Sequence, residues 1–144
     1  MVESASARPP VVRGRFGLFF VLAFAIVALR NPDWWVHPQF VAEDGVVFFR
    51  EQLLDGWRAL FRPYNGYLHT IPRLFAECVS LLPVLWQPFL YQVLSVSLTT
   101  LCSAYFTLPE CRFVIASDWM RMAVSILAIA ICDGTYLFGK IAAC

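Results

Sequence analysis

The sequence predicts an all-α membrane protein with about three transmembrane helices and one amphipathic juxtamembrane helix in its first outward loop. Two features of the composition predict this class. Hydrophobic residues make up 60% of the 144 residues, and charged residues make up only 15%, well below the quarter that is usual in soluble domains. The net charge of +1 gives no basic footprint for nucleic acid, so nucleic acid is not expected as a partner.

The first transmembrane helix is predicted over residues 16–36, after a disordered, basic, cytoplasmic tail over residues 1–15. The run from Phe16 to Leu29 has neither charge nor proline, and arginines flank it at both ends, which suits a helix that crosses a bilayer. A cleaved signal peptide is the alternative. It is less favoured because the one Ala-x-Ala pattern nearby, at Ala23–Ala25, lies inside the apolar run.

The outward loop is predicted over residues 37–73, with an amphipathic surface helix over residues 45–61. Between Val46 and Phe61 the apolar residues fall at helical spacing, with polar residues on the opposite face, a pattern typical of a helix that lies along a membrane surface. The sequence Arg-Pro-Tyr-Asn-Gly that follows has the composition of a turn.

The remaining chain is divided into three predicted parts. Residues 74–108 hold a membrane-entering helix and the second transmembrane helix, because prolines split an apolar stretch too long for one span. Residues 109–121 form a cytoplasmic connection, and residues 122–144 form a third transmembrane segment with a truncated end. The bias of basic residues near the span ends places the amino terminus in the cytoplasm and the acidic loop on the outer face of the membrane.

Two adjacent acids, Glu43 and Asp44, are the candidate catalytic residues. Carboxylates beside a membrane are costly to desolvate, so we expect them to lie in water or to carry out chemistry. A carboxylate there could take a proton from an attacking hydroxyl. The structural alternative is that Asp44 is the N-cap of the surface helix and Glu43 is a solvated charge.

Candidate substrate-binding residues follow in the same loop: Tyr64, Tyr67, His69 and Arg73. The guanidinium of Arg73 suits a phosphate, although anchoring at the headgroup level is the alternative. His69 and Arg73 are four residues apart and would share a helix face, but a satisfied surface histidine is the favoured interpretation of His69. The five cysteines form no ligand-like cluster, so no metal ligands and no cofactor are predicted, and a divalent metal is left open.

These motifs together resemble the amino-terminal part of the polytopic membrane glycosyltransferases of the C superfamily, over roughly residues 16–108. The resemblance rests on the acidic pair in Ala-Glu-Asp-Gly, the surface helix, and Tyr-x-Gly-Tyr-Leu followed by Pro-Arg-Leu. It implies transfer of a sugar from a polyprenyl-phosphate donor on the outer face of a bacterial inner membrane. It also implies that Asp44, with Glu43 beside it, is the general base or contacts a metal or phosphate.

The function expected from this resemblance is that of the front end of such an enzyme, with Arg73 and His69 facing the lipid phosphate. Family members have many more spans, so independent activity of this chain is not expected. The alternative is a small, non-enzymatic membrane subunit that docks onto a larger protein through helix–helix contacts. Membrane lipid is an expected partner in both cases. A transporter fragment is less favoured, because the apolar runs Phe16–Leu29 and Phe89–Leu108 hold no charged residue for a substrate path.

Overall fold

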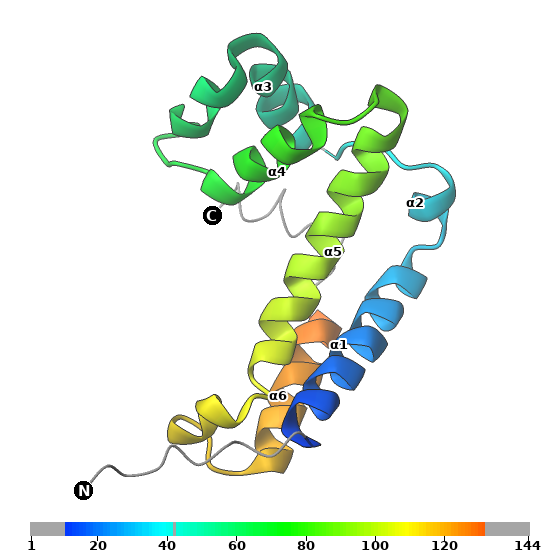
Figure 1. Cartoon of the computed structure of the whole chain (residues 1–144), viewed down its shortest axis with the longest axis vertical. Helices are drawn as coiled ribbons and strands as arrows, with labels where there is room; N and C mark the ends of the chain where they lie inside the picture. The colour runs from blue at the N-terminus through cyan, green and yellow to red at the C-terminus, as the bar shows by residue number, and fades with distance from the viewer. Residues whose placement is uncertain (1–10, 42, 132–144) are drawn as a thin grey trace, which may run out of the picture.

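The computed structural model describes residues 11–41 and 43–131, and within them the chain is built from helices (Figure 1). The only pairing of β type in that part of the chain is an isolated bridge between Tyr64 and Tyr67. In chain order the helical segments are α1 (Val11–Arg30), α2 (Asp33–Val36), the π-helix η1 (Asp44–Phe49), α3 (Arg50–Asp55), the 3-10 helix η2 (Gly56–Phe61), α4 (Thr70–Ser80), the 3-10 helix η3 (Val84–Trp86), α5 (Gln87–Tyr105), the 3-10 helix η4 (Pro109–Phe113) and α6 (Asp118–Ile131).

No helix in the described part of the chain combines the length and the apolarity needed to cross a membrane. The prediction of three transmembrane helices is therefore wrong, and so are the juxtamembrane placement of the surface helix and the inner-membrane location. In α5 and α6, polar residues and short length account for the difference. The 19-residue α5 contains Gln87, Gln92 and several hydroxyl residues, and α6 has only 14 residues. The predicted tail up to residue 10 and the end of the third segment, from residue 132, lie outside the described residues.

The predicted surface helix is helical from Asp44 to Phe61, but its winding changes twice along this length. It begins as a π-helix, continues as the single α-helical stretch α3, and ends as a 3-10 helix. Gly56 marks the second change with a φ of +58°, a conformation that glycine adopts without steric cost. The segment therefore curls into a compact group with α4 and does not form one straight helix (Figure 1).

Helices α1, α5 and α6 form the elongated part of the molecule, and α5 extends from this bundle to the group formed by η1, α3 and α4 (Figure 1). The apolar residues buried in the bundle are few: Ala23, Val27, Val96 and Ile129. A guanidinium nitrogen of Arg30 (Nη1) donates a hydrogen bond of 2.8 Å to the carbonyl oxygen of Ile129, which joins the end of α1 to α6.

The buried face of α5 is lined by small and hydroxyl side chains. The hydroxyls of Ser95, Thr99 and Thr100 donate to the carbonyl oxygens four residues earlier, at 2.9, 3.0 and 2.8 Å. Their hydrogen-bonding capacity is thus met inside the helix, so burial leaves these donors satisfied. Small side chains at such positions allow helix backbones to approach closely.

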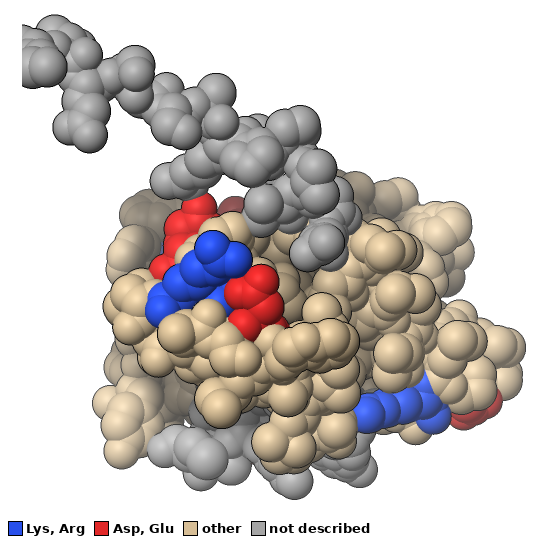
Figure 2. Space-filling model, turned by 90° about the horizontal axis from the view of Figure 1, so that it is seen from below, with Lys and Arg blue, Asp and Glu red and all other residues tan. Residues whose placement is uncertain are grey.

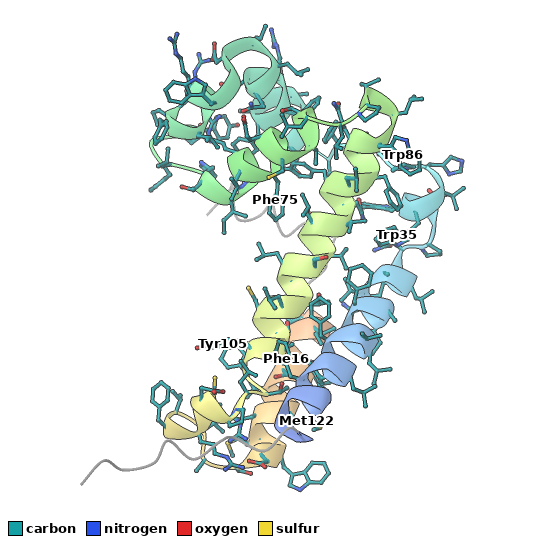
Figure 3. The ribbon with its side chains drawn as sticks, viewed as in Figure 1. Phe16, Trp35, Phe75, Trp86, Tyr105 and Met122 are labelled. Atoms are coloured by element: carbon teal, nitrogen blue, oxygen red, sulfur yellow. The ribbon has the colours of Figure 1, made fainter. Side chains whose placement is uncertain are left out.

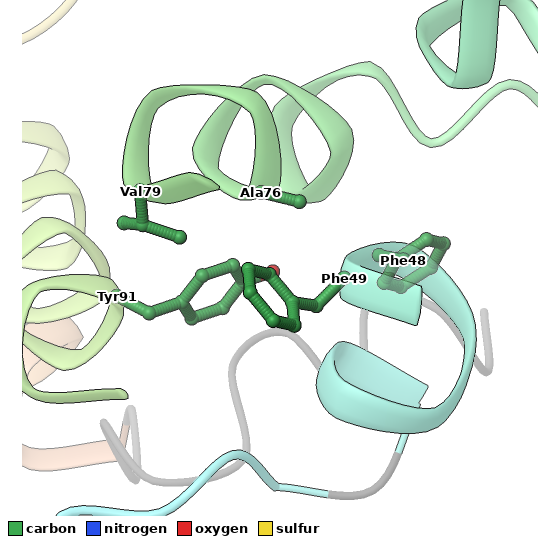
Figure 4. Packing of buried hydrophobic residues seen from close by; sticks show 5 residues of the cluster. All are labelled: Phe48, Phe49, Ala76, Val79 and Tyr91. Atoms are coloured by element: carbon green, nitrogen blue, oxygen red, sulfur yellow. The ribbon is translucent and has the colours of Figure 1, made fainter. Parts of the chain in front are cut away.

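A second core joins α5 to the other group of helices (Figure 4). It contains Phe48 and Phe49 of η1, Ala76 and Val79 of α4, and Tyr91 of α5. The rings of this core come from segments far apart in the sequence. This core therefore holds η1 and α4 in fixed positions against the start of α5.

Candidate functional site

Asp44 is the first residue of the π-helix η1, and its side chain turns inward. The residue is buried, with 6% of its surface exposed. The cap position falls to Glu43, which makes no capping hydrogen bond through its side chain. The structure therefore does not place Asp44 as the N-cap. π-Helical segments are rare and often occur at functional sites, so this position alone marks η1 as a segment of interest.

The pKa of the Asp44 carboxyl is raised from its ordinary value of 3.8 to about 7. Burial is the main cause, because the charged form loses its hydration. The nearby charge of Glu43 raises the pKa further, whereas a hydrogen bond from Tyr91 lowers it. Near neutral pH, Asp44 therefore exists in both protonation states.

Tyr91 is the direct partner of Asp44. Its hydroxyl lies 3.2 Å from Asp44 Oδ1 and 3.3 Å from the carbonyl oxygen of Pro72, and both contacts are buried. Burial, followed by the charge of Asp44, raises the pKa of Tyr91 well above its usual range, so the phenol stays protonated. One hydroxyl group of α5 thereby contacts both η1 and α4.

Arg73 is also buried, with 1% of its surface exposed. Its Nη1 forms an ion pair of 2.8 Å with Glu51 Oε2, and its guanidinium carbon lies 5.2 Å from the centre of the Phe48 ring. Neither Nε nor Nη2 has a hydrogen-bond partner within the part of the chain that the structure describes. Arg62 approaches the other oxygen of Glu51 at 3.6 Å, so one carboxylate lies between two arginines.

His69 and Tyr64 pack around the same Phe48 ring. The three ring centres are separated by 5.4 to 5.7 Å, and His69 Nδ1 lies 3.2 Å from the carbonyl oxygen of Tyr67. The structure thus brings His69, Tyr64 and Arg73 together on one aromatic ring. The side chain of Tyr67 stands apart from them and is 65% exposed.

A tight turn joins Tyr64 to Tyr67. Asn65 and Gly66 both have positive φ angles, 50° and 83°, as a two-residue turn of type I′ requires. The backbones of the two tyrosines exchange hydrogen bonds of 2.9 and 3.0 Å across it. The turn delivers His69 to the start of α4, where it lies beside Phe48.

Sequence reasoning missed Tyr91 and Glu51, the direct partners of Asp44 and Arg73. Tyr91 lies 47 residues from Asp44, inside a segment that was predicted to be a membrane span, so no local pattern pointed to it. Glu51 is one of the polar residues within the predicted surface helix, and a polar helix face gives no reason to expect a buried partner. No group of three or more His, Cys, Asp or Glu side chains suited to a metal ion occurs among the described residues.

Comparisons with protein-family models, with curated proteins and with solved structures found no match. They therefore supply no family or homologue evidence for a glycosyltransferase, and the described helices contradict the membrane part of that resemblance. The catalytic role of Asp44 and Glu43 and the phosphate-binding role of Arg73 stay predictions. Because Asp44 and Arg73 are closed off by packing and paired with Tyr91 and Glu51, the arrangement as it stands stabilises the junction of η1, α4 and α5.

Proposed function

We propose that this chain is a helical subunit that docks its apolar outer faces onto a larger helical protein. The observation that carries the proposal is the distribution of side-chain size in the bundle of α1, α5 and α6. In the interior of the bundle, small or hydroxyl side chains outnumber the larger apolar ones, Val27, Val96 and Ile129, whereas many large apolar side chains lie outside. The small and hydroxyl residues in the interior are Ala23, Ser95, Thr99, Thr100, Ser103, Ala104 and Ser125.

The outer face of α1 supports the proposal most clearly. Leu18, Leu22, Ile26 and Leu29 recur every three or four residues, and each is more than half exposed. Residues at this spacing lie on one side of a helix. Monomeric proteins seldom expose contiguous apolar surface of this kind, and where they do it commonly marks a contact with another molecule.

Helix α6 carries a second apolar surface. Met122 and Ile126 are four residues apart, with 42% and 54% of their surfaces exposed, and Ile131 near the end of the described chain is 72% exposed. Seen from below, uncharged residues cover most of the described surface in view, and the charged ones gather in a few places (Figure 2). A partner that covered these faces would need apolar side chains of its own.

Charge placement indicates which parts of the surface a partner would leave in water. Ion pairs at one end join Glu51, Asp55 and two arginines, and at the other end Asp118 pairs with Arg112 and Arg121. The apolar faces of α1 and α6 lie between these ends. A helical partner aligned with the bundle would cover the apolar faces and leave both charged ends exposed, which is the usual division between the core and the rim of an interface.

Photo-cross-linking in producing cells tests this proposal. A cross-linking residue is placed at position 22 or 126, on the apolar faces, and at position 58 as a control on an exposed charged residue. We expect the same larger adduct from positions 22 and 126, none from position 58, and loss of the adduct when Leu29→Glu is added. The purified complex should have a fixed stoichiometry.

Analytical sedimentation of the purified chain without a partner gives a second test that can contradict the proposal. With its apolar faces uncovered, the chain should self-associate in aqueous buffer, and Leu22→Glu combined with Ile126→Glu should raise the monomer fraction. A wild-type chain that stays a monodisperse monomer at tens of micromolar would contradict the proposal. An adduct of twice the chain mass would replace the larger partner with a second copy.

A further inference from the structure

An aromatic cleft of about 400 Å³ opens where α2 approaches the start of α5. Figure 3 shows Trp35 and Trp86 near α2, at this end of the molecule. None of the lining side chains is charged. They are Trp35, Val36, Pro38, Leu85, Trp86 and Phe89. The cleft is of the size that small ligands occupy.

Three rings form adjoining walls of this cleft. The Phe89 ring lies 5.8 Å from Trp35 and 6.1 Å from Trp86, measured between ring centres, and its plane makes angles of 76° and 79° with theirs. Trp35 is fixed in position by a hydrogen bond of 2.8 Å from its indole N–H to the carbonyl oxygen of Ala28. Trp86 is 58% exposed, so part of its ring is open to a ligand.

The electrostatic character of these rings selects a cation. The face of an aromatic ring carries negative potential, and a cation within about 6 Å of the ring centre is attracted to it. The cleft lining offers no carboxylate, so a primary ammonium would give up hydration without gaining a strong acceptor. A trimethylammonium group has no N–H to satisfy, and its methyl groups suit apolar walls.

The charged residues around the cleft do not oppose such a ligand. Arg30 is directed toward the Ile129 carbonyl oxygen on α6. Asp33, the first residue of α2, forms an exposed pair at 3.0 Å with His37, which caps the end of that helix. We propose that the cleft walled by Trp35, Trp86 and Phe89 binds the trimethylammonium group of a small choline-type molecule.

Titration of the full chain with choline tests this assignment, and 3,3-dimethylbutan-1-ol serves as the decisive control. That alcohol has the shape of choline, with a neutral carbon in place of the charged nitrogen. We expect saturable binding of choline in the millimolar range by calorimetry, and binding of the alcohol weaker by about fivefold or more, since ring–cation attraction at partly exposed sites gives a several-fold preference. Equal binding of the two, or no saturable choline binding up to about 50 mM, would overturn the proposal.

Variants of Trp86 locate the site. Trp86→Leu should abolish choline preference, Trp86→Tyr should retain part of it, and Trp57→Leu should leave it unchanged, because Trp57 lies exposed on η2 and outside the cleft. Far-UV circular dichroism checks that each variant is folded, and Trp86→Tyr keeps the test valid if Trp86→Leu is not. A trimethyl-lysine peptide that bound more than about tenfold tighter than choline would overturn the small-molecule assignment.

Discussion

The hydroxyl of Tyr91 lies 3.2 Å from Asp44 Oδ1 and 3.3 Å from the carbonyl oxygen of Pro72. A single phenol in α5 thus contacts both segments that close the junction, η1 and α4. The phenol has one proton and two acceptors, so the protonation state of Asp44 decides how the contact is shared. When Asp44 is ionised, the Tyr91 hydroxyl donates its hydrogen bond to the carboxylate. When Asp44 is neutral, the hydroxyl can donate to the Pro72 carbonyl oxygen.

The stability of the chain should fall as pH rises through the range set by Asp44. Its pKa is about 7 in the folded protein, against an ordinary value of 3.8, so the native state binds more protons between these values. The contribution of Asp44 to the free energy of unfolding is complete below about pH 4, decreases between about pH 4 and 7, and no longer changes with pH above about 7. The complete shift corresponds to roughly 4 kcal/mol, an upper bound.

Asp44→Asn isolates this contribution, because asparagine keeps an oxygen for Tyr91 and does not titrate. Urea midpoints from pH 5 to pH 8 should fall in the wild type and fall less in the variant, which should be the more stable protein at pH 8. Glu43→Gln is the matched control and should keep most of the wild-type slope. Parallel pH profiles for wild type and Asp44→Asn would contradict the prediction.

Tyr91→Phe should destabilise the protein by about 1–3 kcal/mol, since it leaves buried acceptors on Asp44 and Pro72 without this donor. The hydrogen bond from Tyr91 lowers the pKa of Asp44, so its removal should also move the pH dependence upward. Denaturant unfolding at several pH values measures both effects. A variant that lost stability without any change in pH profile would show that the hydroxyl acts through the Pro72 carbonyl oxygen and not through Asp44.

Glu51→Gln should be far more destabilising than Asp55→Asn. Glu51 pairs with Arg73, whose side chain is fully buried, and removing one partner of a buried pair typically costs about 3–5 kcal/mol. Asp55 pairs with Arg62 at 2.5 Å, but both side chains are more than a third exposed, and such pairs contribute about 0–1 kcal/mol. Equal losses in the two variants, measured by urea unfolding, would show that Arg73 does not depend on Glu51.

Gly45→Ala should destabilise the protein by about 1–3 kcal/mol. A Cβ atom at position 45 would lie 2.8 Å from the Cβ of Phe40, an atom too close to the backbone to move aside cheaply. Gly17→Ala is the control in α1, where a Cβ meets nothing within 4 Å and alanine should stabilise the helix by about 0.5–1 kcal/mol. Thermal unfolding compares the two; a higher midpoint for both would contradict the close contact.

Local patterns in the sequence predicted helices correctly, but the assignment of three of them as membrane spans was wrong. Periodicity located the helical stretch from Asp44 to Phe61, because alternation of apolar and polar faces is a local property. Average hydropathy then misled, since it overlooked the glutamines and hydroxyl residues of α5 and the shortness of α6.

Single residues of the candidate site could be predicted from the sequence, but the contacts between them could not. Asp44 stands out in the sequence as one of two adjacent acids, and Arg73 as a guanidinium that suits a phosphate; both are buried in the structure. Their partners did not stand out. Tyr91 meets Asp44 only because α5 packs against η1, and long-range packing of that kind leaves no mark in a local sequence pattern.

The distribution of side-chain size in the bundle, with mostly small side chains inside and large apolar ones outside, also bears on how much of this chain accumulates in a cell. Chaperones and quality-control proteases recognise exposed apolar residues on proteins that lack their binding partners. The exposed leucine and isoleucine side chains of α1 form such a surface. Copies made in excess of the proposed partner would be removed. The abundance of this chain would then be set by the synthesis of another protein, and its own expression level would matter little.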